Sequence, residues 1–193
     1  MLRRLYDWTM SLAGHRRAML GLAFVAFVES SVFPIPPDVL LVPMVLANRE
    51  RAWRIATVCT LASVVGGIVG YIIGFFLFES FGRPLLEFYG YADQFARFQA
   101  GYNHWGGWIV AIAGLTPFPY KVITIASGVT HLDLSTFAYA SVLSRGARFF
   151  MVAALLWQYG PPVRAFIEEH LATLTIAFFV LLIGGFLIIR FAL

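Results

Sequence analysis

Two long apolar stretches constrain what this chain can fold into more than any other feature. Residues 55–78 and 172–189 contain no charged residue, and each is close to the ~20 helical residues that cross ~30 Å of hydrocarbon. Gly66, Gly70 and Gly74 are spaced four apart, which permits close helix contact. The sequence is 60% hydrophobic and 12% charged over 193 residues, whereas soluble domains are ~45–50% apolar and ~25% charged. The sequence therefore predicts an all-α integral membrane protein formed as one membrane domain.

Prolines break two further apolar stretches near their middles. The tip prolines are Pro34, Pro36 and Pro37 in residues 18–47, and Pro117 and Pro119 in residues 106–129. Proline does not continue a helix, and no arm of either stretch is long enough to cross a bilayer alone. Each stretch is predicted to be a re-entrant hairpin that enters and leaves on the same side of the membrane. Such backbone survives at membrane depth where protein covers it or where it lines a wet cavity.

The two proline motifs belong to an internal repeat. A shift of 83 positions aligns Pro34 with Pro117, Pro36 with Pro119 and Asp38 with Lys121. In each unit a polar break and a long helix, residues 55–78 or 134–159, follow the hairpin. Since one crossing separates the units, the second hairpin is predicted to open on the opposite face. An inverted repeat with broken helices is a common transporter design.

The remaining segments complete the predicted organisation. The segments are an interfacial helix 1–17, repeat one 18–78, an amphipathic linker 79–105, repeat two 106–160 and an added C-terminal transmembrane helix 171–190. A solvated N-terminus is the alternative for residues 1–17. The linker is expected to form one or two surface helices. Arginines are concentrated in residues 1–17 and 48–54, so the positive-inside rule places the N-terminus in the cytoplasm.

Five ionisable residues in apolar surroundings are the candidate functional residues. They are Glu29, Asp38, Lys121, Arg145 and Arg148. A charge at the centre of a membrane helix costs roughly 2.5–3.5 kcal/mol on insertion scales, so such residues usually have a function.

Two roles are predicted for these charges. Arg145 and Arg148 are three positions apart and share a helix face, and with Lys121 they are predicted to bind a substrate phosphate. Glu29 and Asp38 are predicted to couple transport to protons, because a carboxyl in an apolar environment is disfavoured in its charged form. The alternatives are buried ion pairs that fix the hairpins against residues 134–159, or arginines that extend to an interface.

Enzyme and cofactor motifs are absent from the sequence. It contains no Walker loop, G-x-S-x-G or H-E-x-x-H pattern. The single cysteine, Cys59, and the scattered histidines show no metal-ligand spacing. No catalytic residue, cofactor or metal is expected. Nucleic acid is not an expected partner, because no basic run interleaves with aromatics. The expected partners are membrane lipids, and a homo-oligomer is left open.

Three motifs resemble those of a known family. They are ESSVFPIPPD at residues 29–38, TPFPYK at 116–121 followed by ASG at 126–128, and SRGARF at 144–149. Together they resemble the DedA family, also called VTT-domain or SNARE-associated membrane proteins, and particularly its YqaA-like branch. The resemblance covers about residues 17–160.

The resemblance implies two opposed re-entrant hairpins and movement of polar-headed lipids between leaflets. For a bacterial inner-membrane member, the implied substrate is undecaprenyl phosphate or a phospholipid, with dependence on the proton-motive force. By motif match, Glu29 and Asp38 are the implied acidic pair of the first hairpin, and Lys121 is the implied basic residue of the second. Many members carry a further arginine ahead of the second hairpin's proline, where this chain has Leu115 and Thr116. Arg145 or Arg148 is the candidate to replace it.

The predicted function is therefore a flippase or scramblase for a lipid phosphate. Its rivals are a small-solute or ion exporter and a non-transporting structural protein of membrane assembly. A lipid-modifying enzyme is a further rival, which the missing nucleophile and metal motifs disfavour.

Overall fold

The structure is a computed structural model that describes residues 18–31, 36–116, 118–160 and 162. The predicted interfacial helix 1–17, the C-terminal span 171–190 and the tip residues Pro34 and Pro117 lie outside this part of the chain. All regular secondary structure in the described part is helical. The prediction of an all-α protein is confirmed there.

Most helix boundaries lie close to those of the predicted segments. They are α2 (Ala18–Ser31), α3 (Asp38–Ala47), the short 3₁₀-helix η1 (Arg49–Arg51), α4 (Ala52–Leu77), the π-helical turn η2 (Phe78–Gly82), α5 (Arg83–Tyr89), α6 (Ala92–Leu115), α7 (Tyr120–Val129) and the helix Leu134–Gly160. Two helical runs of the described chain, Arg49–Tyr89 and Leu134–Gly160, are long and apolar enough to cross a membrane.

Local sequence sets several helix starts. Pro37 precedes the first residue of α3 and Pro119 precedes the first residue of α7, in agreement with the tolerance for proline at helix starts. Asp133 caps the helix Leu134–Gly160, because its carboxylate accepts hydrogen bonds from the Thr136 backbone N–H at 2.8 Å and hydroxyl at 2.9 Å. Hydrogen bonds from Ser135 and Thr136 hold the pKa of this exposed carboxyl below its ordinary value.

The central helix is α4, and glycines let its neighbours approach its backbone. Gly66 lies directly against the Phe27 carbonyl of α2, and Gly74 lies against the Ile125 carbonyl of α7. In return, Gly128 of α7 lies against the Tyr71 carbonyl of α4. A Cβ atom at any of these glycines would overlap backbone atoms of the neighbouring helix. The predicted close helix contact at the glycines of this span is confirmed.

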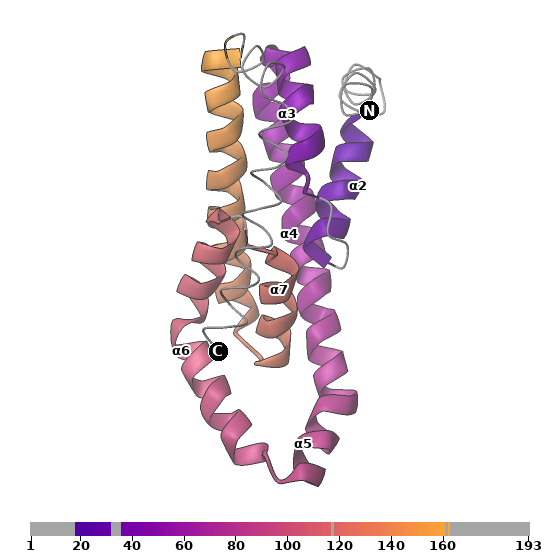
Figure 1. Ribbon diagram of the computed structural model, residues 1–193, viewed down its shortest axis with the longest axis vertical. Coiled ribbons are helices and arrows are strands. Elements are labelled where there is room, and N and C mark those ends of the chain that lie inside the picture. The colour runs from indigo at the N-terminus through magenta and orange to yellow at the C-terminus, as the bar shows by residue number, and fades with distance from the viewer. Residues whose placement is uncertain (1–17, 32–35, 117, 161, 163–193) are drawn as a thin grey trace.

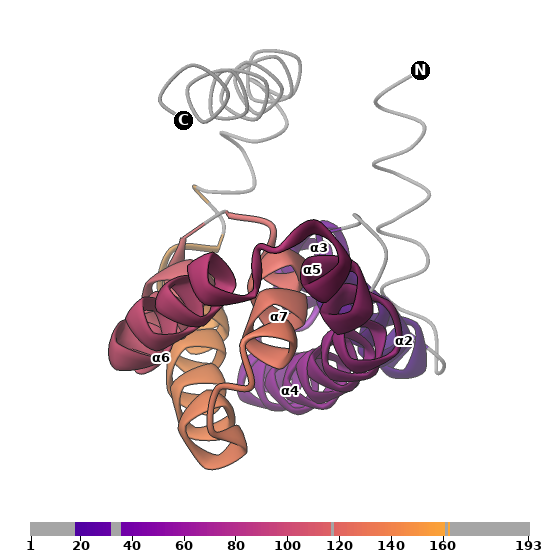
Figure 2. The ribbon, with the colours of Figure 1, turned by 90° about the horizontal axis from the view of Figure 1, so that it is seen from below.

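The helices are arranged along one long axis, with a short helix beside α4 at each end. Figure 1 shows α4 running along this axis, with α2 and α3 beside its first half and α7 beside its second half. Seen from below, α7 lies among α4, α6 and the helix Leu134–Gly160 (Figure 2).

Two buried apolar clusters divide the interior. One joins α2, α3, the first half of α4 and the second half of Leu134–Gly160, and contains Leu41, Ile55 and Phe149. The other joins α4, α6, α7 and the first half of that last helix, and contains Tyr71 and Phe137. The buried polar residues described below lie between these clusters along both long helices.

The amphipathic segment differs from its predicted boundary. Two helices form, α5 and α6, joined where Gly90 takes a left-handed conformation with φ 71°. However, α6 continues to Leu115 without a break at Trp105, so the linker and the first arm of the second hairpin share one helix. Gly106 is buried against the Leu132 side chain, and this packing favours a continuous helix over the glycine's low propensity.

The end of α4 leaves α-helical geometry at the turn η2. Glu79 of this turn lies 3.0 Å from Arg83 and 3.1 Å from the imidazole of His131. His131 has a left-handed φ of 53°, and its ring packs on Phe75 and Phe78. These contacts join the end of α4 to the turn after α7.

Candidate functional site

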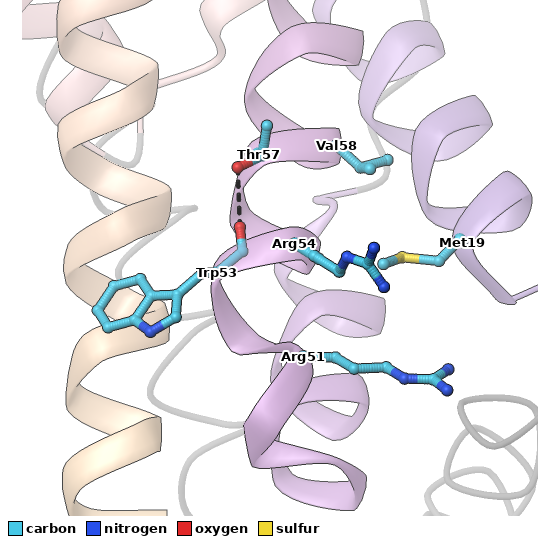
Figure 3. A pocket seen from close by; sticks show the side chains of 6 residues that line it. All are labelled: Met19, Arg51, Trp53, Arg54, Thr57 and Val58. Carbon is cyan, nitrogen blue, oxygen red and sulfur yellow. Dashed lines mark hydrogen bonds between the residues drawn. The ribbon is translucent and has the colours of Figure 1, made fainter.

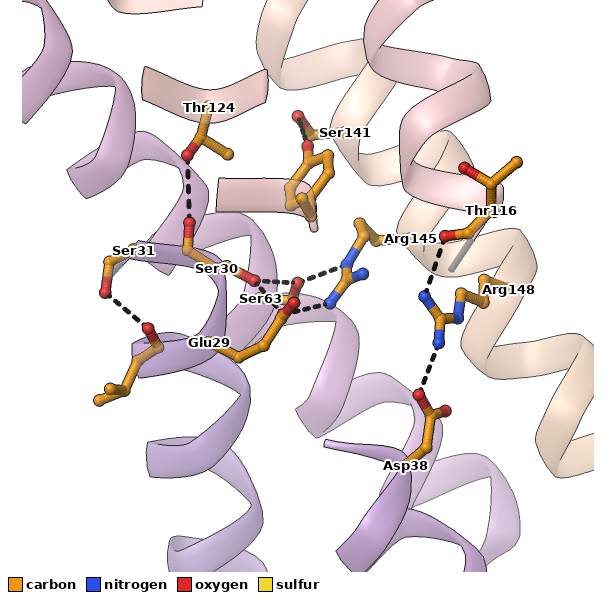
Figure 4. A network of polar contacts seen from close by, with 12 residues as sticks. Glu29, Ser30, Ser31, Asp38, Ser63, Thr116, Thr124, Ser141, Arg145 and Arg148 are labelled. Atoms are coloured by element: carbon orange, nitrogen blue, oxygen red, sulfur yellow. Dashed lines mark hydrogen bonds and ion pairs between the residues drawn. The ribbon is translucent and has the colours of Figure 1, made fainter. Parts of the chain in front are cut away.

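Four of the five predicted charges meet as two ion pairs. Arg145 pairs with Glu29 at 2.9 Å and Arg148 pairs with Asp38 at 2.6 Å (Figure 4). The arginines share one helix, whereas Glu29 lies in the last turn of α2 and Asp38 is the first residue of α3. The two arginines therefore attach separate arms of the first proline-broken segment to the helix Leu134–Gly160.

The Glu29–Arg145 pair belongs to a closed ring of hydrogen bonds. The Arg145 Nε donates to Ser63 Oγ at 2.6 Å, and the two serine hydroxyls, Ser63 and Ser30, lie 2.7 Å apart. Ser30 donates to Glu29 at 3.1 Å, so Ser63 must be the donor to Ser30. The same carboxylate oxygen accepts the second bond from Arg145. Hydrogen bonds of this kind reduce the cost of burying the two charges.

Aromatic rings and helix packing enclose this first pair. The Arg145 guanidinium carbon lies 4.8 Å from the centre of the Tyr120 ring and 4.6 Å from that of Phe149, within the range of cation–π attraction. The Arg145 side chain is 1% exposed and that of Glu29 is 14% exposed. A soluble ligand therefore has little access to Arg145 in this conformation.

The Asp38–Arg148 pair is more accessible and connects the two proline motifs. The side chains are 26% and 21% exposed. Arg148 also donates from its other terminal nitrogen to the Thr116 carbonyl at 3.3 Å. Asp38 follows the first proline motif and Thr116 begins the second, so one guanidinium joins both chain breaks (Figure 4).

The remaining predicted site residues lie around these pairs. Lys121 is the second residue of α7 and is partly buried, and none of the described residues forms an ion pair with it. Pro36 and Pro37 lie directly before Asp38, and Pro119 lies directly before α7. The predicted three-cation cluster is thus not a continuous set of contacts, because each arginine has its own acid.

Both long helices place the charged layer near their midpoints. Ser63 is eleven residues from the start of α4 and fourteen from its end, or roughly 16 Å and 21 Å along the axis at 1.5 Å per residue. Arg145 is likewise eleven residues into Leu134–Gly160. In helices that cross a bilayer, these positions would lie close to its midplane.

The hydroxyl groups of this site were not predicted from the sequence. Ser30 and Ser63 are fully buried and complete the ring around Arg145. Tyr120, also fully buried, contacts Arg145 through its ring and donates from its hydroxyl to Ser141. The available signal was the presence of serines inside apolar helices, directly beside a glutamate in the case of Ser30. Within the described chain, no group of three His, Cys, Asp or Glu residues could hold a metal ion.

Comparison with known proteins identifies the family. The family model of the VTT domain matches residues 35–158. The chain belongs to the VTT-domain family, that is, the DedA family. Proteins of this family are membrane proteins with a transporter-like role.

Relatives occur in bacteria and in an archaeon. An uncharacterized protein of Haemophilus influenzae is 40% identical over 151 residues, which covers 78% of each chain. An uncharacterized homologue in Histophilus somni is 36% identical over the same length and coverage. An uncharacterized protein of Methanocaldococcus jannaschii is 26% identical over 133 residues, covering 68% of this chain and 79% of the relative. No solved structure matches the chain.

Proposed function

We propose that this VTT-domain protein moves a phosphate-bearing lipid, such as undecaprenyl phosphate or a phospholipid, between membrane leaflets. The observation that carries the proposal is the accessible Asp38–Arg148 pair, whose guanidinium also binds the Thr116 carbonyl. A group that competes for Arg148 would act on both proline motifs at once. A flippase or scramblase that works by such competition for Arg148 needs no catalytic residue.

Phosphate is the competitor that suits this position. A guanidinium has five N–H donors in a planar fork and binds phosphate through two of them. At Arg148, two terminal nitrogens bind a carboxylate and a carbonyl. A lipid phosphate would replace the Asp38 carboxylate as the anionic partner, and Lys121, close along the chain to the second proline motif, would supply a second cation.

Exchange between phosphate and carboxylate also gives a route to proton coupling. Protonation of Asp38 removes its negative charge and weakens its hold on Arg148, which favours phosphate binding. Deprotonation restores the pair and expels the phosphate. Glu29 would act in the same way on Arg145 only when the buried pair opens, so Arg145 would contact substrate later in the cycle than Arg148.

The inverted repeat is part of the proposal, and the helix boundaries support it. A shift of 83 positions carries the start of α3, at residue 38, to residue 121, one residue after α7 begins. It carries α4 (Ala52–Leu77) to residues 135–160, one residue from the observed start of Leu134–Gly160. The short helices α3 and α7 lie toward opposite ends of the long axis (Figure 1). Two re-entrant hairpins opening to opposite sides of a bacterial inner membrane, with a cytoplasmic N-terminus, account for this arrangement.

Cysteine labelling tests the hairpin model. In a variant whose single native cysteine is replaced, Cys59→Ala, new cysteines at Arg16 and at Asn48 should react with an impermeant reagent from the same side of the membrane. If the two positions react from opposite sides, the first proline segment crosses the bilayer and the hairpin model is wrong.

Reconstitution tests the proposed transport. Purified protein in liposomes should move a fluorescent lipid phosphate between leaflets, and Arg148→Gln should reduce the initial rate at least tenfold, whereas Arg97→Gln, at an exposed position of α6, should leave it unchanged. The Glu29→Gln, Asp38→Asn double variant should lose the pH dependence of the rate. An unchanged pH profile would favour passive scrambling.

The same preparation separates the rival functions. Movement of a small solute or ion without lipid would support an exporter. Wild-type folding and oligomeric state with no movement of either would support a structural role.

A further inference from the structure

A second basic feature lies at the other end of the first apolar cluster, away from the two ion pairs. A groove of about 500 Å³ opens between α2 and the start of α4 (Figure 3). The residues that line it are Met19, Arg51, Trp53, Arg54, Thr57 and Val58. One wall is cationic and the other surfaces are largely apolar, so the groove is amphipathic.

The two arginines of this groove extend from the same side of the helix. Arg51 and Arg54 are one helical turn apart, and Figure 3 shows both side chains extending toward the side of α2. Both residues are exposed. Neither forms an ion pair with Glu50, their neighbour in sequence, or with another residue that the structure describes. Within the described part of the chain, the charge of both arginines therefore has no acidic partner.

An apolar row continues from the arginines along the same helix face. Val58, Leu61 and Val65 follow Arg54 at four, seven and eleven positions, the spacing of one helix face. Leu61 is 60% exposed and Val65 is 52% exposed. From Arg54 to Val65 the axial distance is about 16 Å, close to the ~15 Å of one hydrocarbon leaflet.

Trp53 marks the level of the membrane surface at this end. Its indole is directed toward Leu134–Gly160 (Figure 3), where it lies 6.1 Å from the rings of Phe150 and Trp157. Tryptophan concentrates where headgroups meet hydrocarbon. Arg51 and Arg54 are thus at headgroup level, with the apolar row extending into the hydrocarbon.

We propose that this groove binds an anionic phospholipid that is not the transported molecule. Its phosphate lies between Arg51 and Arg54, and one acyl chain lies along Val58, Leu61 and Val65. The apolar row selects a lipid over a soluble phosphate. The site is separate from the ion-pair layer, because Arg54 and Ser63 are nine residues apart on α4, or about 13 Å along its axis.

Native mass spectrometry of the detergent-purified full chain tests this assignment. Phosphatidylglycerol should bind more tightly than phosphatidylcholine with the same acyl chains. The Arg51→Gln, Arg54→Gln double variant should bind phosphatidylglycerol about 30-fold more weakly, since each basic residue beside an anionic lipid contributes a factor of about five. Arg97→Gln removes one exposed arginine on α6 and should leave the affinity unchanged.

A second pair of variants tests the acyl track. Leu61→Ser should weaken phosphatidylglycerol binding severalfold. Leu143→Ser changes a comparably exposed leucine, at 71% against 60%, on the helix Leu134–Gly160, and should not. The proposal would be overturned if the two lipids bound equally well, or if the double-arginine variant bound phosphatidylglycerol as tightly as the wild type. It would also be overturned if Arg97→Gln lost as much affinity as the double-arginine variant. Displacement of the lipid by an equal concentration of glycerol phosphate would overturn the assignment to a lipid.

Discussion

The Arg145→Gln substitution gives a sharp test of the buried ion pair, because its effect should depend on pH. The change leaves the Glu29 carboxylate, 14% exposed, without its cationic partner. Removing one member of a buried pair typically costs about 3–5 kcal/mol. Glu29 can avoid a buried charge by binding a proton. The loss of folding stability therefore cannot exceed the free energy of protonating this carboxylate.

The proton cost can be worked out from a reference glutamic acid. With an ordinary pKa of about 4.3, protonation at pH 7 spans about 2.7 pH units at ~1.36 kcal/mol each, or about 3.7 kcal/mol. At pH 5.5 the same cost is only about 1.6 kcal/mol. The folded variant would hold a proton that its unfolded chain releases, so its stability should fall as pH rises from 4.3 toward 7. In the wild type, Arg145 supplies the cationic partner of this carboxylate.

Unfolding in mixed micelles, followed by tryptophan fluorescence, measures the effect. Arg145→Gln should lose about 2 kcal/mol less stability at pH 5.5 than at pH 7. The Glu29→Gln, Arg145→Gln double variant needs no proton and should be more stable than the single variant at pH 7, with little pH dependence. If the loss in Arg145→Gln is the same at both pH values, or if the double variant shows no recovery, the reasoning about a buried charge pair is refuted.

Three further predictions concern other parts of the molecule. Gly128→Ala places a Cβ against the Tyr71 carbonyl and should destabilise the α4–α7 contact by about 1–3 kcal/mol; Gly101→Ala, whose Cβ would meet no atom within 4 Å, is the control in the same unfolding assay. Lys121→Ala should abolish lipid-phosphate transport with normal expression, and Lys121→Arg should retain part of it because charge persists while geometry changes; normal transport by Lys121→Ala would remove Lys121 from the site. The lowered pKa of the exposed Asp133 carboxyl means that its cap stabilises the fold above the ordinary carboxyl range and is lost as pH falls through the folded value. Asp133→Asn should therefore flatten the acid limb of a thermal-stability profile between pH 5 and pH 3, and an unaltered limb would contradict this.

The sequence was most informative about helix ends, because they depend on local chemistry. The predicted helix 134–159 begins at the same residue as the observed Leu134–Gly160 and ends one residue earlier. Asp133 caps its start. The prolines before Asp38 and Tyr120 likewise determine where α3 and α7 begin. In contrast, the continuous α6 was not predicted, because packing of Gly106 on Leu132 depends on a contact between separate segments.

The charged site could be predicted in composition but not in pairing. Two acids and two arginines in apolar stretches are visible in the sequence, and ion pairing was one of the alternatives. Nothing local determines that Arg145 pairs with Glu29 and Arg148 with Asp38. Their unequal exposure, 1% and 21%, depends on how Tyr120 and Phe149 enclose one guanidinium and leave the other at the proline motifs.

The π-helical turn at Phe78–Gly82 gives the long α4 run one residue more than an α-helix would use there. Each α-helical residue turns the chain by about 100°, so this extra residue rotates everything beyond it relative to the glycines that contact α2 and α7. Deleting a single residue of the turn would restore α-helical phase and rotate the side chains of α5 by about 100° about the helix axis. Glu79 would then lose its alignment with His131, while the ion pairs near Ser63 would keep theirs. The turn thus separates the helical phase of the charged layer from that of the segment beyond it.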